Sequence, residues 1–227
     1  LDRARRRAAE LVEAGFTTIK VKVGTGLSDD VERVRTVRET IGPDLDLVID
    51  ANGGYDAETA IAAAHAMEDL NVGLFEQPTP RGDFGGLAQV RSAVDCPVMA
   101  DDICFDLADA RECLRNDACD VISVYPGKNG GIAKSKQIVD LAARHNVACS
   151  IGSNLELDVA TAAMCHLVIA CPNMQVERFP GDILGPEYHE TSIAKNPVSI
   201  EGPIVTIGDQ PGLGVEVDWS VVEKQFA

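Results

Sequence analysis

Aromatic and basic residues are scarce in this chain of 227 residues. Phe, Trp and Tyr make up 4% of it, while 45% is hydrophobic, so the apolar weight rests on Ala, Val, Ile and Leu. Such residues fill the interior of α/β barrels. Lys and Arg number 20 against 36 Asp and Glu, which gives a net charge of −16. Nucleic acids and anionic lipids repel such a chain, so we expect neither a nucleic-acid nor a membrane partner.

The chain also lacks long apolar runs and closely paired cysteines. No stretch approaches the roughly 18 uninterrupted apolar residues of a membrane-spanning helix, and residues 1–7 lack the apolar core of a signal peptide. The seven cysteines are an odd number and include no Cys-x-x-Cys motif. We therefore expect reduced thiols in a cytoplasmic protein.

Short apolar runs alternate with helical patterns, about one pair every 25 residues. This rhythm predicts βαβ units around a parallel sheet, in one barrel or one doubly wound domain. In the first connection, Asp29 and Glu32 have the spacing of a capping box and predict the start of a helix that ends at Gly42. The predicted strands lie at 17–23, 45–50, 73–76, 98–101, 120–124 and 147–151.

The two ends depart from this rhythm. Residues 1–14 have a helical pattern with no strand before it, and residues 202–227 form a Gly- and Pro-rich stretch without barrel periodicity. We therefore predict a barrel domain at 1–200 and a C-terminal tail at 201–227. An N-terminal segment is expected to be missing.

Three carboxylates end successive predicted strands, those of Asp50, Glu76 and Asp101. They lie about 25 residues apart, which places them at one level on the C-terminal rim of a parallel barrel. A single acid at a strand end is commonly a turn or capping residue. Three in register would repel one another unless a cation neutralised them. An all-oxygen ligand set suits Mg²⁺, or Mn²⁺ in its place.

One unit earlier, Lys20 and Lys22 alternate with Ile19, Val21 and Val23 in a predicted strand. Period two sends both lysines to the face opposite the apolar residues. If the apolar face meets the helices, two ammonium groups point into the barrel. Each would lower the pKa of the other and so prepare one lysine to act as a base near neutral pH. The alternative is an edge strand with solvated lysines.

Together these motifs resemble one known family. In order and spacing the chain resembles the muconate-cycloisomerase (muconate-lactonizing) and mandelate-racemase-like barrels of the enolase superfamily, in the segments 20–22 (KVK), 50–52 (DAN), 76–78 (EQP), 100–102 (ADD), 128–131 (KNGG) and 152–156 (GSNLE). Each motif is weak alone, but the ordered set is specific and covers nearly the whole chain.

The resemblance implies a TIM-type (β/α) barrel of the enolase C-terminal-domain kind, here without its first strand and its N-terminal capping domain. In the family, magnesium stabilises an enolate, and the C-terminal tail returns toward the capping domain. The resemblance makes Asp50, Glu76 and Asp101 the metal ligands, and Lys22 the acid/base with Lys20 beside it.

Substrate contacts and assembly follow from the same resemblance. The substrate is expected to be a small carboxylate, and we expect a homo-oligomer. The residues expected to bind the substrate are Asn52, Ser153, Glu156 and Asp182.

Tyr125 stands where the resemblance breaks. Members of this branch carry a second catalytic lysine five residues before the Gly-Gly pair, and counting back from Gly130 gives Tyr125. Lys128 matches a lysine that often precedes the glycines in addition to the catalytic one, and it remains the other candidate. A tyrosine with a pKa of about 10 donates a proton readily but is a poor base. A phenol opposite Lys22 therefore weighs against a two-base racemase or epimerase.

The leading interpretation is a magnesium-dependent lyase or isomerase that moves a proton next to a substrate carboxylate, as muconate cycloisomerases do. Acid-sugar or hydroxy-acid dehydratases and racemases or epimerases are alternatives, although residues 177–186 lack the Asp-x-Asp pair with which dipeptide epimerases hold a substrate ammonium. Two alternatives differ in class. One is a non-catalytic metal-containing barrel that binds carboxylates, and the other is a Schiff-base aldolase using Lys22 or Lys128.

Overall fold

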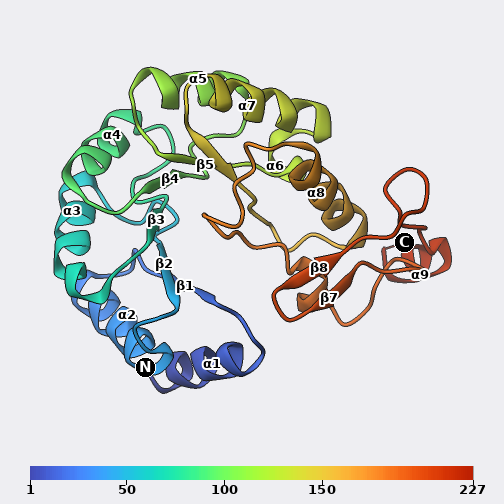
Figure 1. The fold of residues 1–227 in the computed structure, drawn as a ribbon, viewed down its shortest axis with the longest axis horizontal. Helices are drawn as coiled ribbons and strands as arrows, with labels where there is room; N and C mark the ends of the chain where they lie inside the picture. Colours follow the sequence, from blue (N-terminus) through green and yellow to red (C-terminus); the bar gives the residue numbers. More distant parts are fainter. Residues whose placement is uncertain (227) are drawn as a thin grey trace.

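The computed structural model describes residues 1–226 and shows a curved parallel sheet with helices around its outside (Figure 1). Six strands pair in sequence order: β1 (Thr18–Lys22), β2 (Asp46–Asp50), β3 (Leu74–Glu76), β4 (Val98–Ala100), β5 (Val121–Ser123) and β6 (Ala148–Ser150). The helices are α1 (Asp2–Glu13), α2 (Leu27–Ile41), α3 (Ala57–Ala66), α4 (Phe84–Ala93), α5 (Leu107–Arg115), α6 (Pro126–Asn129), α7 (Ile132–Arg144) and α8 (Asp158–Ala170). The predicted α/β barrel architecture is confirmed.

Two apolar layers alternate along the strands, as period two requires. In β2, Leu47 and Ile49 belong to the large core cluster that the helices share, whereas Val48 belongs to a smaller cluster on the inner face of the sheet. Each strand from β2 to β6 contributes one residue to the smaller cluster, which consists of Val48, Leu74, Met99, Val121, Ala148 and Phe179. The inner face of the sheet is therefore packed below the strand ends.

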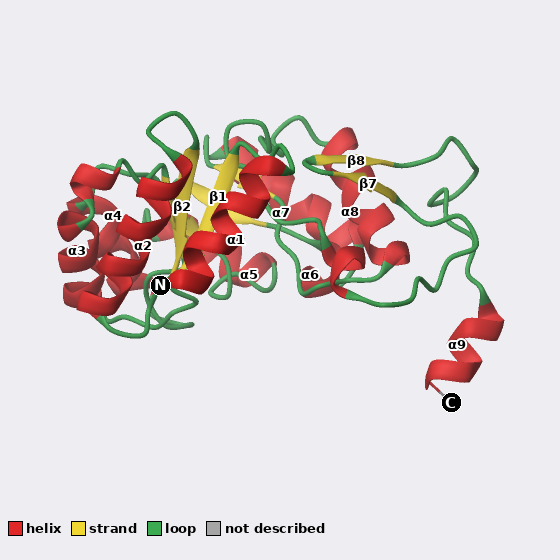
Figure 2. Ribbon diagram, turned by 90° about the horizontal axis from the view of Figure 1, so that it is seen from below, coloured by secondary structure: helices red, strands yellow, loops and turns green. Residues whose placement is uncertain are grey.

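The segment after α8 continues the sheet and then leaves it. A parallel bridge joins Met174 to Cys149, and the Gln175 amide donates to the Cys149 carbonyl at 2.7 Å. Farther on, β7 (Ser199–Glu201) and β8 (Ile204–Thr206) form an antiparallel hairpin, and α9 (Trp219–Phe226) lies far from the parallel sheet (Figure 2). The hairpin begins just before the predicted tail, and the domain limit at 200 stays a prediction.

All seven cysteines are free. Six are buried and Cys96 is partly exposed, so the prediction of unpaired thiols agrees with the structure. Within residues 1–226, none of the helices combines the length and the apolar character that crossing a bilayer requires.

Candidate functional site

The predicted site residues lie at one edge of the sheet. Lys22, Asp50 and Glu76 are the last residues of β1, β2 and β3, and the register pairs Lys22 with Asp50 and Asp50 with Glu76. Asp101 follows β4 directly. Because side chains alternate along a strand, each carboxylate lies two residues beyond a member of the inner apolar cluster and points to the same face. The sequence therefore placed the three acids at the correct level.

A cavity of about 440 Å³ opens at this edge. It is also lined by Asp102, Asn154 and Leu155, which belong to the 100–102 and 152–156 motifs but were not predicted as site residues, and by Tyr188, which lies in no motif. The predicted residues that line it are Lys20, Lys22, Asp50, Asn52, Glu76, Asp101, Tyr125, Ser153 and Asp182, whereas Lys128 and Glu156 do not line it.

Each of the three carboxylates is paired with a lysine. Lys20 donates to Glu76 at 2.9 Å, Lys22 donates to Asp50, and Lys128 donates to Asp101 at 2.7 Å. In this paired arrangement, no three His, Cys, Asp or Glu side chains of residues 1–226 form a group that could hold a metal ion. The metal site predicted from the sequence therefore stays a prediction.

The donor set nevertheless fits a divalent cation. Asp50, Glu76 and Asp101 are all buried and offer the oxygen ligands that Mg²⁺ prefers. Burial, together with repulsion from Asp50 and Asp101, raises the pKa of Glu76 to about 7 although Lys20 opposes the shift. The carboxylates thus repel one another at this edge, and a cation bound among them would offset that repulsion.

Lys20 does not behave as its spacing from Lys22 suggested. Burial lowers the pKa of Lys20, but the carboxylates of Glu76 and Asp50 more than offset this and raise it. The expectation that the two lysines depress each other's pKa is wrong for Lys20, because each ammonium has an acidic partner across the strands. The burial pattern of β1 does confirm that both lysines lie opposite Ile19 and Val21.

Tyr125, and not Lys128, faces the cavity. The Lys128 side chain is 0% exposed, and its ammonium donates to the Asp101 carboxylate, to the Asp101 carbonyl at 2.8 Å and to the Ser123 carbonyl at 2.9 Å. All three of its N–H groups are thereby used. The ammonium also lies 4.8 Å from the centre of the Tyr125 ring. Lys128 is therefore a buried counter-ion behind the site.

The Tyr125 ring depends on a glycine in the next loop. A Cβ on Gly152 would lie 2.7 Å from the ring and 2.3 Å from the Ser123 hydroxyl, so no larger residue fits without movement. The phenol lies 3.4 Å from the Asn154 side-chain oxygen. Burial, followed by the negative charges of Asp101 and other acids, raises the pKa of Tyr125 well above its usual value. The phenol therefore stays neutral, so it can donate a hydrogen bond but is not a ready base.

Glu156 shapes the loop after β6. Its Oε2 accepts from the Ser153 hydroxyl and from the Asn154 amide, both at 2.8 Å. Its Oε1 is buried without a partner among the described residues and faces Gly127. Glu156 thus supports residues that line the cavity, while Asp182 lines it directly and accepts from the Leu184 amide at 2.9 Å.

The loop that follows Lys22 is anchored by Asp30, a residue that sequence analysis passed over. The buried carboxylate accepts from the amides of Gly24, Thr25 and Gly26 at 2.9 Å each. Gly26 precedes α2 without a side-chain cap, so the predicted capping box at Asp29 is wrong. α2 begins at Leu27, two residues before Asp29. The three amides before the helix therefore donate to Asp30 and not to Asp29.

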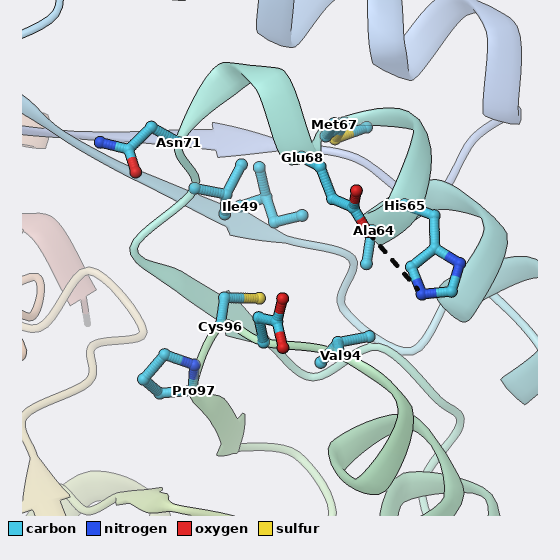
Figure 3. A pocket seen from close by; sticks show the side chains of 11 residues that line it. Ile49, Ala64, His65, Met67, Glu68, Asn71, Val94, Cys96 and Pro97 are labelled. Atoms are coloured by element: carbon cyan, nitrogen blue, oxygen red, sulfur yellow. Dashed lines mark ion pairs between the residues drawn. The ribbon is translucent and has the colours of Figure 1, made fainter.

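A second cavity, of about 390 Å³, lies at the opposite end of the strands (Figure 3). Ile49, Met67 and Pro97 line it together with His65, whose ring nitrogen lies 3.1 Å from the Ala93 carbonyl. None of the predicted catalytic, metal or substrate residues lines this cavity. The second cavity has titratable side chains of its own, His65, Glu68, Asp95 and Cys96, but the three aligned carboxylates and the lysines lie at the C-terminal strand ends.

Comparison with known proteins agrees with this geometry. The chain is 35% identical over 212 residues to the hydrophobic dipeptide epimerase of Enterococcus faecalis, covering 92% of this chain and 59% of that protein. The crystal structure of the Enterococcus faecalis dipeptide epimerase complexed with Mg and L-Leu-L-Tyr superimposes with a TM-score of 0.88, covering 93% of this chain and 59% of that one. Muconate cycloisomerase 1 of Rhodococcus opacus is 31% identical, with coverage of 95% and 58%.

The chain thus spans about three-fifths of the length of the relatives it matches. These relatives are enzymes, an epimerase and a cycloisomerase. Residues 3–221 match the family model described as enolase C-terminal domain-like. The chain belongs to the enolase C-terminal domain-like family of the enolase superfamily.

Proposed function

We propose that this chain carries the chemistry of a metal-dependent isomerase that moves a proton at the carbon next to a carboxylate of a small substrate. The observation that carries the proposal is the position of Lys22. Its ammonium contacts Asp50 and donates to Asn52 at 2.7 Å, while 63% of its side chain remains exposed in the cavity. It is an accessible lysine beside three buried carboxylates.

The site residues have different roles in the proposed reaction. Asp50, Glu76 and Asp101 would hold Mg²⁺, with Mn²⁺ as a possible substitute, and the cation would neutralise the charge that develops on the substrate carboxylate. Lys22 takes or returns the proton on one face of the substrate. Asn52, Ser153 and Asp182 line the space in which the rest of the substrate is held.

Epimerisation or racemisation of an amino-acid derivative is the outcome that the comparisons favour. The dipeptide epimerase is 35% identical to this chain and the muconate cycloisomerase 31%. The racemase or epimerase alternative therefore replaces cycloisomerisation as the first candidate. In this reaction the neutral Tyr125 phenol would supply a proton to the face opposite Lys22.

Dehydration of a hydroxy acid is the second candidate, and Tyr125 is the observation that favours it. A phenol whose pKa is raised stays protonated at neutral pH, so it does not remove a proton from carbon but can donate a hydrogen bond to a leaving hydroxyl. Such a reaction needs one base, and Lys22 supplies it. A homo-oligomeric state and a cytoplasmic location remain predictions.

Proton NMR in deuterated buffer tests the proposal. The protein with Mg²⁺ is incubated with a panel of dipeptides, N-acyl amino acids and hydroxy acids. Loss of the α-proton signal that requires Mg²⁺ supports the proposal, and the product separates its branches because inversion indicates an epimerase and loss of water a dehydratase. No exchange with any acid, together with Mg²⁺-dependent binding of the acids, would indicate the non-catalytic barrel instead.

A further inference from the structure

A neighbouring cavity lies beside the site, among the loops that follow β2, β3 and β4. It measures about 450 Å³ and shares Asn52 and Asp102 with the cavity that holds Lys22. Its remaining wall includes Pro80, Arg81 and Phe105. The two cavities therefore adjoin at Asn52 and Asp102.

Arg81 is the positively charged side chain that lines this cavity. Its guanidinium carbon lies 4.0 Å from the centre of the Phe105 ring, so one face of the planar group is covered by the aromatic ring. Among the ion pairs and hydrogen bonds within residues 1–226, none involves the Arg81 side chain. A guanidinium stacked in this way keeps its N–H edge available for a bidentate acceptor.

The floor of the cavity is fixed by Gln77. This fully buried side chain accepts from the amides of Asp101 at 2.8 Å and Ile103 at 3.1 Å and donates to the Thr79 carbonyl at 2.7 Å. The Gly53 amide donates to the Gln77 carbonyl at 2.7 Å. Three loops after successive strands are thereby joined, and the space beneath Arg81 is formed in advance of any ligand.

Gly53 allows the loops to approach this closely. Its φ is +74°, and a Cβ there would lie 3.1 Å from both the Pro80 Cα and the Thr79 carbonyl oxygen. The backbone of the loop after β2 thus rests directly against the loop that carries Arg81. The position of Arg81 relative to Asn52 follows from this contact.

We propose that Arg81 forms an anion subsite that binds a second carboxylate of the substrate, distant from the reacting carbon. This inference rests on the proposed function, which places the first carboxylate among Asp50, Glu76 and Asp101 with the metal. Asp102 lines the shared part of the two cavities and repels an anion there, so the second carboxylate lies at the Arg81 end. The substrate class is therefore a dicarboxylate, such as an amino-acid derivative with an acidic side chain or acyl group.

Calorimetry with simple acids tests the subsite. The chain with Mg²⁺ is titrated with succinate, glutarate, adipate and pimelate, each against the monocarboxylate of equal chain length. We expect one length to bind about 10- to 100-fold more tightly than its monocarboxylate, as a charge-assisted pair to Arg81 would give. In Arg81→Gln the dicarboxylate should bind only about twofold more tightly than the monocarboxylate, because it has two equivalent ends that can bind the metal. Arg81→Lys should retain part of the wild-type preference for the dicarboxylate.

Arg178→Gln is the matched control, because Arg178 is also exposed and also stacks on a ring, that of Phe179 at 4.8 Å, but lines neither cavity. It should keep the full preference. A wild type without preference at any length, or an Arg81→Gln protein that keeps it, overturns the subsite while Mg²⁺-dependent binding of monocarboxylates leaves the proposed function intact. If no acid binds in a Mg²⁺-dependent way, the proposed function fails and the subsite fails with it.

Discussion

Three lysines near the site differ in what they can do, although all three contact a carboxylate. Lys128 is enclosed and has no free N–H, and Lys20 is largely buried against Glu76. Lys22 alone among them is more exposed than buried, so it can meet a substrate. The accessible member of the set is therefore the base in the proposed reaction.

Replacing Lys22 by Ala should lower the rate of α-proton exchange by about 10²- to 10⁴-fold, because a positioned acid/base group contributes that much. Proton NMR in deuterated buffer measures it with any acid that the wild type exchanges. Lys195→Ala is the control, since Lys195 is exposed and pairs with Glu216 on the surface, and lines neither cavity of the site. A Lys22→Ala protein with more than about a tenth of the wild-type rate would exclude Lys22 as the base.

Tyr125→Phe should separate the two faces of the substrate. Because its phenol is neutral, we expect deuterium exchange at the Lys22 face to stay within about tenfold of the wild type. The inverted or dehydrated product, which needs the Tyr125 proton, should fall by about 10²-fold. Chiral chromatography and NMR of the recovered acids give both rates. Equal loss of exchange and product, or unchanged product, would remove Tyr125 from this role.

At the scale of elements, the loop after β1 decides where Lys22 lies. Arg33 of α2 donates to the Lys22 carbonyl at 2.8 Å and to Asp30 at 2.6 Å, and the Tyr55 hydroxyl donates to Asp30 at 2.5 Å. A Cβ on Gly54 would lie 2.3 Å from the carbonyl oxygen of the glycine at position 24, so the loops after β1 and β2 touch through their backbones. Helix, loop and neighbouring loop thus fix the end of β1 together.

Asp30→Asn should destabilise the fold by about 2 kcal/mol at neutral pH, the contribution of charge-assisted hydrogen bonds to a carboxylate. Burial alone would raise the pKa of Asp30, but hydrogen bonds from Tyr55, Gly26 and Arg33 outweigh it and lower the pKa. The folded-state pKa therefore lies below the unfolded value of about 3.9, and Asp30 contributes stability above about pH 4 and loses it as the pH falls further.

Urea unfolding between pH 3 and 7 checks this expectation. The difference between the wild type and Asp30→Asn should be largest at neutral pH and shrink below about pH 4. Asp29→Asn is the matched control, because Asp29 is the adjacent exposed acid on α2 and makes no side-chain hydrogen bond within residues 1–226. A difference that does not change with pH would show that the charge of Asp30 is not what stabilises the loop.

The loop after β1 also shows which contacts local sequence patterns do not predict. All six strands of the parallel sheet were predicted to within a few residues, since each is a short apolar run between helical patterns. Asp29 and Glu32 matched a local capping motif, but it is Asp30 that accepts the hydrogen bonds of the loop amides. Its partners Tyr55 and Gly24 come from two other segments, and no local spacing in one helix reveals them.

At the scale of the molecule, distant carboxylates meet because all six strands run the same way. This regularity made Asp50, Glu76 and Asp101 predictable from their separation alone. It could not decide between Tyr125 and Lys128, because the short helix α6 (Pro126–Asn129) turns the chain after β5 and buries the lysine. The cavity lined by Arg81 could not be predicted from the sequence either, because it forms where three loops pack together.

Magnesium should stabilise the whole chain. Saturation to about 100 times the dissociation constant adds about 2.7 kcal/mol to the free energy of unfolding, which raises the melting temperature of a chain of this size by about 5–10 °C. Scanning fluorimetry with ionic-strength-matched NaCl measures the shift. Asp50→Asn should lose it, and Asp140→Asn, at the exposed pair with Lys136, should keep it. An unchanged shift in Asp50→Asn would place the cation elsewhere.

The reactivity of the buried cysteines reports which parts of the molecule open. All seven cysteines lie at or beyond Cys96, and burial raises the pKa of Cys149, so this thiol scarcely ionises in the folded chain. An alkylating reagent can then reach the buried thiols only when the strands and helices around them separate. Mass spectrometry of alkylated peptides over time would therefore show which part of the second half opens first, with Cys96 modified earliest and Cys104, Cys113 and Cys149 modified together when the core is lost.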